Sequence, residues 1–191
     1  EQLQLLIGQG FDPVTKKALG RPYRKYPTTA ERIERRAAKL AARLPVTERA
    51  AAVAAIESEE AARDSRKAVA GFDFTFSIPK SASVLWAVSD AGTQSLIADA
   101  HHAAVAEMVA FIEREVAATR VGAAGRNGAV AQADVSGVIA TTFDHYDSRA
   151  GDPHLHTHVV ISNKVQTVHD GKWRSLDGLP LHAADVALSE L

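Results

Sequence analysis

An alternation of aromatic and polar residues near the middle of the chain constrains the fold more than any other feature. Phenylalanine stands at positions 72, 74 and 76 and isoleucine at 78, with Asp73, Thr75 and Ser77 between them. Successive side chains of a strand point to opposite faces, so this period of two predicts a half-buried β-strand. Its aromatic face should pack in the core, which leaves its polar face, including Asp73, available for other contacts.

Two helical segments precede this strand. Residues 28–44 are rich in Ala, Arg and Leu; Thr28 is a favourable N-cap residue, and Pro45 ends the segment. Thr47 can cap a second helix that runs to about residue 68. We expect these segments to form a helical hairpin with a solvated charged face. Before it, residues 8–29 predict a loop that carries Tyr23 and Tyr26.

The rest of the chain predicts helices interleaved with antiparallel strands. Pro79 closes the aromatic strand before a short helix, which Ser81 or Ser83 could cap. Apolar residues recur at helical spacing over residues 93–118, and Asp170-Gly171 marks a hairpin turn. A Gly/Ala-rich loop is expected at residues 122–128, and strands at residues 135–146, 154–165 and 172–174. The fold class is therefore α+β.

Composition narrows the class of protein. The 191 residues suit one domain, and the absence of cysteine excludes thiol nucleophiles, thiolate ligands and disulfides. The longest uncharged runs are broken before the roughly 20 residues that cross a bilayer, so we expect no membrane insertion. With a formal net charge of −1, a nucleic-acid role would need a local basic patch rather than bulk attraction.

A cluster of histidines is the strongest functional signal. His154, His156 and His158 alternate, so on a strand they share one face. Neighbours in this series lie about 6.6 Å apart along the strand, so two imidazoles can share one metal ion but three cannot easily do so. His145 is the best third ligand, because it ends the preceding strand and a short loop returns the chain beside it. Such a site keeps positions open for water or substrate, and Asp73 could orient a ligating ring.

A metal-free interpretation of the same cluster stays open. Residues 154–160 also fit the alternating motif of the histidine-triad nucleotide hydrolases, in which a histidine attacks a phosphate without metal. That motif does not account for His145 or Asp73. The isolated histidines at positions 101, 102, 169 and 182 are expected to be surface or hydrogen-bonded residues.

Longer motifs around these residues resemble one family. They are GFDFTFSIPKS at residues 71–81, FDH at 143–145, SRAGDPHLHTH at 148–158 and DGKWRSLD at 170–177. These segments are similar to the conjugative relaxases of the TrwC/TraI (MobF) type, within the HUH endonuclease superfamily. The resemblance covers most of the chain from residue 70 onward. It implies a palm-like, mostly antiparallel β-sheet with helices packed on one side, here preceded by the helical hairpin.

The resemblance implies a metal-dependent, site- and strand-specific DNA nickase and strand transferase, or relaxase, that acts at a conjugative transfer origin. A tyrosine oxygen attacks the scissile phosphate and the 3′-hydroxyl departs, which leaves a 5′-phosphotyrosine. By motif position, His145, His156 and His158 match the ligands of one divalent metal ion (Mg, Mn, Zn or Ni). Asp73 matches a catalytic carboxylate that orients a ligating histidine, and His154 stands where the family commonly has glutamine.

The resemblance also places Glu1 several dozen residues after the family's catalytic tyrosine. We therefore expect residues 1–191 to be a partial relaxase domain, with a loop and helical hairpin in residues 1–70 and a metal-binding α+β core in residues 71–191. The N-terminal nucleophile segment would be missing, and we do not expect Tyr23, Tyr26 or Tyr146 to replace it. This fragment is then inactive alone.

The remaining expectations concern partners. Lys80, Arg149 and Arg174 flank the motifs and are candidates for contacts with DNA phosphates. The resemblance implies single-stranded DNA of a transfer origin and other relaxosome and conjugation proteins as partners of a monomer in the bacterial cytoplasm. A non-catalytic, metal-dependent single-stranded DNA-binding module is the alternative without enzyme activity.

Overall fold

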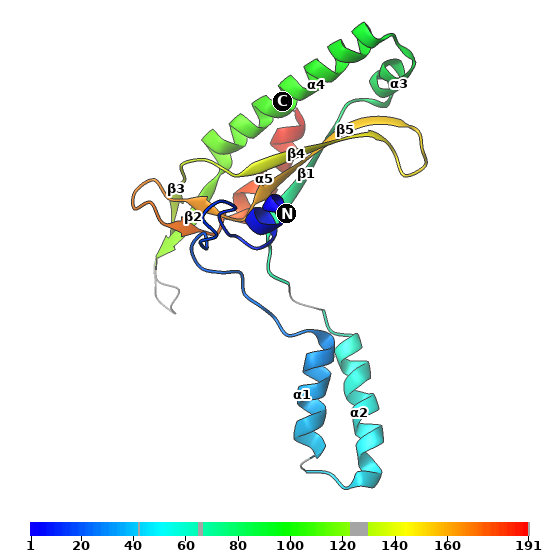
Figure 1. Ribbon diagram of the computed structural model, residues 1–191, viewed down its shortest axis with the longest axis vertical. Helices are drawn as coiled ribbons and strands as arrows, with labels where there is room; N and C mark the ends of the chain where they lie inside the picture. Colours follow the sequence, from blue (N-terminus) through cyan, green and yellow to red (C-terminus); the bar gives the residue numbers. More distant parts are fainter. Residues whose placement is uncertain (42, 65–66, 123–129, 191) are drawn as a thin grey trace. The chain divides into compact units, whose positions relative to one another are not determined.

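The chain divides into two compact units, which Figure 1 draws. The computed structural model describes residues 1–41, 43–64, 67–122 and 130–190. The core unit comprises Glu1–Pro22 and Ala70–Leu191, and the hairpin unit comprises Tyr23–Val69. The N-terminal residues therefore pack with the core, whereas the sequence grouped them with the hairpin. The Leu19 side chain is buried, and the Lys164 ammonium donates a hydrogen bond to the Arg21 carbonyl.

A three-stranded antiparallel sheet forms the centre of the core unit. Its order is β1 (Gly71–Ser77), β5 (Pro153–Ser162) and β4 (Ala140–Asp147). Phe72 pairs with Ile161 and Phe74 with Val159, so the aromatic face of β1 continues the apolar face of β5. The predicted period of two is confirmed, and Asp73 lies on the opposite face.

Helices cover the apolar face of this sheet. They are α3 (Lys80–Val88), α4 (Ala91–Phe111) with its π-helical extension η2 (Ile112–Val116), and α5 (Gly178–Glu190). Figure 1 shows α4 running along one side of the strands. Asp90 starts α4 because its carboxylate accepts the Gly92 and Thr93 N–H groups at 2.9 and 3.1 Å. The resulting core combines helix and strand residues: Val105, Met108, Ile112, Val116, Val159, Ile161, Val165, Leu176 and Leu181.

By length and composition, the helical segment Ala91–Val116 is apolar enough to cross a membrane. From the sequence we expected no membrane insertion. Val105, Met108 and Ile112, in the second half of the segment, are buried in the core, whereas only 22% of its most apolar window is buried. Core helices of soluble proteins pass the same length and composition test, so the test by itself does not define a membrane span.

Short strand pairs extend the core unit at one end. β2 (Ala118–Gly122) pairs with β3 (Val130–Asp134), and β6 (Val165–Gln166) pairs with β7 (Trp173–Arg174). The predicted turn before β7 is present, with Gly171 at φ +62° and the Lys172 N–H donated to Asp170. A short π-helix, η1 (Gln4–Gly8), lies near the N-terminus.

The hairpin unit consists of α1 (Thr29–Ala41) and α2 (Val46–Ala61), as predicted, although α2 ends earlier than expected. Thr28 begins α1 through a capping box. Its hydroxyl accepts the Glu31 N–H at 3.2 Å, and the Glu31 carboxylate accepts the Thr28 N–H at 2.7 Å. Pro45 takes the N-cap position of α2, where the sequence favoured Thr47.

Other sequence predictions need correction. The strand expected at residues 135–146 begins only at Ala140, since Gly137, at φ +138°, interrupts the extended chain. Pro79, rather than Ser81 or Ser83, precedes α3. Ser83 is instead buried, and its hydroxyl accepts the Leu155 N–H at 3.2 Å, which ties α3 to β5. Most of the predicted loop at residues 122–128 lies outside the described residues.

Candidate metal centre

Three histidines converge on the face of the sheet opposite the helices. His145 of β4 pairs directly with His156 of β5, and His158 follows two residues later on the same face. Their ring centroids lie 5.0–5.4 Å apart. One ring nitrogen from each residue falls within 4.8 Å of those of the other two. His145 is exposed and His156 is buried, so the group forms a partly open cluster at the surface of the sheet.

Hydrogen bonds fix the proton positions of two of these rings. His156 Nδ1 lies 2.8 Å from the carbonyl oxygen of His154, and His158 Nδ1 lies 3.0 Å from Asp73 Oδ1. Each oxygen can only accept, so each Nδ1 carries the proton and donates it. In the neutral form of each ring, Nε2 then carries the lone pair. Asp73, predicted from type and face alone, thus holds a ring of the cluster.

The donor set fits a divalent metal ion. Neutral imidazoles with one nitrogen engaged and the other free are the usual form of metal-ligating histidines. Three protein ligands are fewer than such ions take up, which leaves positions for water or a substrate oxygen. The cluster is therefore suited to bind an anionic oxygen next to a cation.

His154 does not join the cluster. Its ring stacks on that of His156, with the centroids 4.6 Å apart, and its backbone carbonyl accepts the His156 proton. The spacing along the strand predicted that His154, His156 and His158 would not all bind one ion. The third nitrogen of the cluster indeed comes from His145 of β4 rather than from a third position on β5. His154 contributes to the cluster by orienting a neighbour.

A second polar network lies on the helix-covered face of the same strands. The Thr157 hydroxyl donates to Asp144 Oδ1 at 2.7 Å and accepts from His101 Nε2 at 2.8 Å. His102 Nε2 lies 3.0 Å from Asp144 Oδ2. The Thr157 hydrogen bond lowers the pKa of Asp144, and burial lowers that of His101. Sequence reasoning placed His101 and His102 among hydrogen-bonded or surface residues, but it missed Asp144 and Thr157.

Tyr146 follows His145 and lies away from the cluster, as predicted. Its ring stacks on that of Trp86 in α3, with centroids 5.4 Å apart and planes inclined by 11°. The phenol is therefore held on the helix side of the sheet. Tyr146 is poorly placed to attack a phosphate bound at the three histidines.

The three predicted phosphate contacts differ in their surroundings. The Lys80 ammonium donates to the Pro153 carbonyl at 2.9 Å, and Arg149 is exposed in the turn between β4 and β5. Pro153 and Arg149 both lie between His145 and His156 in the sequence. Arg174 lies farther along the chain, where both of its terminal nitrogens bond to the Asp170 carboxylate at 2.7 Å. The hydrogen bonds from Arg174 hold the pKa of Asp170 well below its usual range.

An antiparallel sheet that presents a three-histidine cluster and an orienting aspartate on its open face defines a candidate metal-dependent phosphoryl-transfer protein. The family model described as TrwC relaxase matches residues 1–191. The chain belongs to the TrwC relaxase family.

Individual relatives agree with this assignment. The multifunctional conjugation protein TraI of Escherichia coli is 41% identical over 106 residues, which cover 56% of this chain and 6% of TraI. TraI of Escherichia coli strain K12 is 39% identical over a stretch of the same length. The chain thus spans only a small part of these curated relatives.

Solved structures of the conjugative relaxase TrwC share the fold. A metal-free complex of TrwC with OriT DNA has a TM-score of 0.55 and 34% identity, covering 67% of this chain and 43% of TrwC. A metal-bound complex has a TM-score of 0.54 and 33% identity, covering 63% and 39%. A copper-bound complex has a TM-score of 0.56 and 34% identity, covering 68% and 42%. Metal-bound relatives and the histidine cluster together indicate a divalent metal site in this chain.

Proposed function

We propose that this chain forms the metal-binding part of a relaxase, which nicks one DNA strand at a conjugative transfer origin and stays linked to its 5′ phosphate. The observation that carries the proposal is the convergence of His145, His156 and His158 beside Asp73. The TrwC and TraI relatives support it, since TrwC binds OriT DNA and TraI is a conjugation protein.

The roles of the residues follow from their contacts. His145, His156 and His158 would hold the ion, which, when bound, supplies positive charge beside a non-bridging phosphate oxygen. Asp73 keeps the proton of His158 on Nδ1, and the His154 carbonyl does the same for His156. These hydrogen bonds hold both rings in one orientation, which leaves Nε2 of each ring available to the ion. Lys80, Arg149 and Arg174 would contact neighbouring phosphates of the DNA strand.

The reaction exchanges one phosphodiester bond for another. A tyrosine oxygen bonds to the scissile phosphorus while the bond to the 3′ oxygen breaks, and the proton lost by the tyrosine is balanced by one gained by the 3′ oxygen, which departs as a hydroxyl. We propose that this tyrosine lies outside residues 1–191. Tyr146 is stacked on Trp86, and the family resemblance places Tyr23 and Tyr26 in the loop that follows the catalytic tyrosines.

The finer details belong to the same proposal. The resident ion is Mg, Mn, Zn or Ni, since imidazole ligands and cellular supply suit each of them. The partner is single-stranded DNA of a transfer origin, together with other relaxosome and conjugation proteins. The protein acts as a monomer in the bacterial cytoplasm.

A cleavage assay on labelled, single-stranded transfer-origin DNA tests the function. The chain alone should yield no covalent adduct. A version extended at its N-terminus by the tyrosine-bearing segment of a relaxase should yield one that depends on added metal ion. The same extended version with His156→Ala should be inactive.

Three outcomes would contradict the proposal. An adduct trapped at Tyr23 or Tyr26 with the chain alone would place the nucleophile within these residues. Metal-independent cleavage by the extended version, or none at all with a folded and metal-loaded protein, would remove the role assigned to the histidine cluster.

A further inference from the structure

The hairpin unit differs in charge from the rest of the chain. Tyr23–Val69 contains eleven Lys and Arg against seven Asp and Glu, a formal charge of +4. The remaining residues therefore carry −5. A protein that is nearly neutral overall thus concentrates positive charge in one unit of 47 residues. Local concentration of this kind is the electrostatic footprint of a polyanion-binding surface.

A buried carboxylate organises the arginines of this unit. The Glu60 side chain of α2 is only 1% exposed, and it accepts from Arg32 Nε at 2.6 Å and from Arg36 at 2.9 Å. These hydrogen bonds lower the pKa of Glu60 and tie α1 to α2. Arg32 also donates to the Pro27 carbonyl at 3.1 Å, which fixes the entering loop against the hairpin. One carboxylate thus anchors two arginines.

The cations around this anchor exceed the carboxylates that face them. Arg63 also approaches Glu60, at 3.7 Å, but its side chain is 66% exposed. Arg24 is exposed and has no carboxylate partner among the residues that the structure describes. Its guanidinium lies over the Tyr26 ring, 5.1 Å from the centroid. Stacking holds this charge in place without neutralising it, so less side-chain entropy is lost when it binds an anion.

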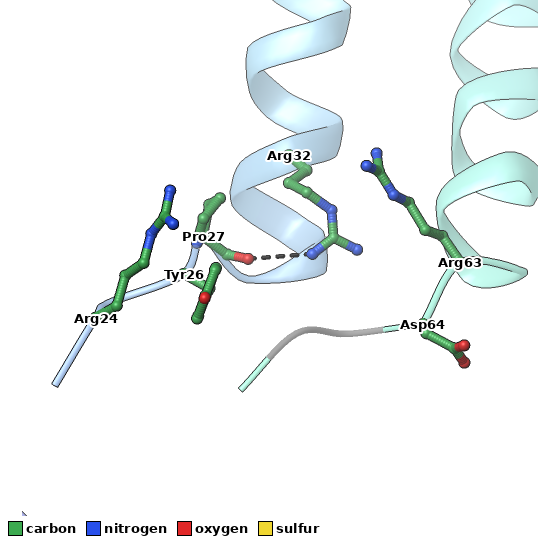
Figure 2. A pocket seen from close by; sticks show the side chains of 6 residues that line it. All are labelled: Arg24, Tyr26, Pro27, Arg32, Arg63 and Asp64. Atoms are coloured by element: carbon green, nitrogen blue, oxygen red, sulfur yellow. Dashed lines mark hydrogen bonds between the residues drawn. The ribbon is translucent and has the colours of Figure 1, made fainter. Parts of the chain in front are cut away.

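These groups surround one hollow of about 200 Å³ at the open end of the hairpin. Its lining residues are Arg24, Tyr26, Pro27, Arg32, Arg63 and Asp64. Figure 2 shows the guanidinium groups of Arg24 and Arg63 on either side of Arg32, whereas the Asp64 carboxylate points away from them. Three guanidinium groups flank the hollow, with Tyr26 at its edge.

We propose that this hollow binds a backbone phosphate of the DNA strand, with Arg24 and Arg63 as its direct contacts and Arg32 as a fixed charge behind them. Guanidinium groups match phosphate oxygens in geometry and keep their charge at every physiological pH. The inference rests on the proposed relaxase function, since that function supplies the DNA. It adds a second DNA contact, in a unit that carries none of the three histidines.

The test measures DNA binding by the 191-residue chain, with a chelator present so that the metal site plays no part. Binding of a labelled single-stranded oligonucleotide is followed by fluorescence anisotropy over a series of salt concentrations. The Arg24→Ala/Arg63→Ala double variant should bind about tenfold more weakly. Each lost phosphate contact should reduce the slope of log affinity against log salt by about 0.7, or about 1.4 for the pair.

A matched control separates the hollow from diffuse charge. Arg35→Ala/Arg43→Ala removes the same charge from exposed residues of the same unit outside the hollow, and it should change the affinity less than threefold. Arg24→Lys/Arg63→Lys keeps the charge and should retain more affinity than the alanine pair. Circular dichroism confirms that each variant keeps its helices.

The inference is overturned if the two alanine pairs weaken binding equally, or if neither does so in folded protein. Failure of the relaxase function looks different. In that case the wild-type chain still binds the oligonucleotide in chelator, while the extended protein does not cleave it.

Discussion

The two faces of the central sheet carry the same kinds of side chain and use them differently. The open face has His145, His156, His158 and Asp73. On the helix-covered face, Asp144 and Thr157 of the strands meet His101 and His102 of α4. On the covered face, the named nitrogens of both histidines end on a protein oxygen. On the open face, the hydrogen bonds of His156 and His158 are made at Nδ1, and one nitrogen from each of three rings lies within 4.8 Å of the other two.

This difference shows what separates a ligand cluster from a structural network. Proximity of histidine and aspartate is common to both faces. The open face gathers one nitrogen from each of three rings and holds two of those rings through their Nδ1 atoms. On the covered face, the hydrogen-bond donors and acceptors are paired with one another, as buried polar groups require. Variants on each face should therefore fail in different ways.

The largest effect is expected from His156→Ala, which removes the buried nitrogen of the open face. Metal affinity should fall by more than about a hundredfold, because loss of a ligand exceeds the roughly 10–100-fold cost of losing a supporting hydrogen bond. Isothermal titration with Zn²⁺ or Mn²⁺ measures this. His102→Ala is the matched control on the covered face, and equal losses in the two variants would erase the distinction between the faces.

Asp73→Asn should have the next largest effect. The amide keeps the size of the side chain but loses the charge that stabilises the Nδ1–H form of His158. Metal affinity should fall by about 10–100-fold while the chain stays folded. The same titration, with circular dichroism as the check on folding, measures it. Unchanged affinity would show that Thr75, whose hydroxyl lies 3.3 Å from His158 Nδ1, suffices to orient the ring.

Thr157→Val tests the covered face. Valine fills nearly the same volume but leaves Asp144 Oδ1 and the His101 Nε2–H without their partner. The free energy of unfolding should fall by about 1–3 kcal/mol, and metal affinity should change less than threefold. Urea denaturation measures the first and titration the second. The exposed Thr142→Val on β4 serves as the control, and a stability loss of the same size there would point to strand propensity rather than to the network.

The residues of the open face could be predicted from the sequence because the patterns that mark them lie within short segments. The alternation of His156 and His158, and the short return loop after His145, place three rings on one face once the strands are known. Asp73 needed the register of β1 against β5, in which Thr75 pairs with His158, and this could only be guessed from the polar face of β1. The family motifs then matched His145, His156 and His158 to a ligand set by their positions.

The covered face was not accessible in the same way. His101 and Thr157 are 56 residues apart, and their contact depends on how α4 packs across β5. No spacing rule relates a helix position to a strand position across a packed layer. α5 was missed for a related reason, since its apolar residues do not form a single stripe and Pro180 stands in its first turn. The buried Leu181 nevertheless joins the core.

The smallest effect, and the most specific to the covered face, concerns pH. Because burial lowers the pKa of His101, the folded state keeps this ring neutral where the unfolded chain takes up a proton. The stability that depends on a neutral His101 is therefore fully present above the unfolded pKa of about 6.5 and is lost as the pH falls below it.

His101→Gln can still donate to Thr157 but does not titrate. Measured by urea denaturation in chelator, the stability of the wild type should fall more steeply below about pH 6.5 than that of the variant. Parallel curves would mean that His101 is solvated enough to be protonated in the folded state. The two faces would then differ in their ability to bind a metal ion but not in how far their polar groups are shielded from water.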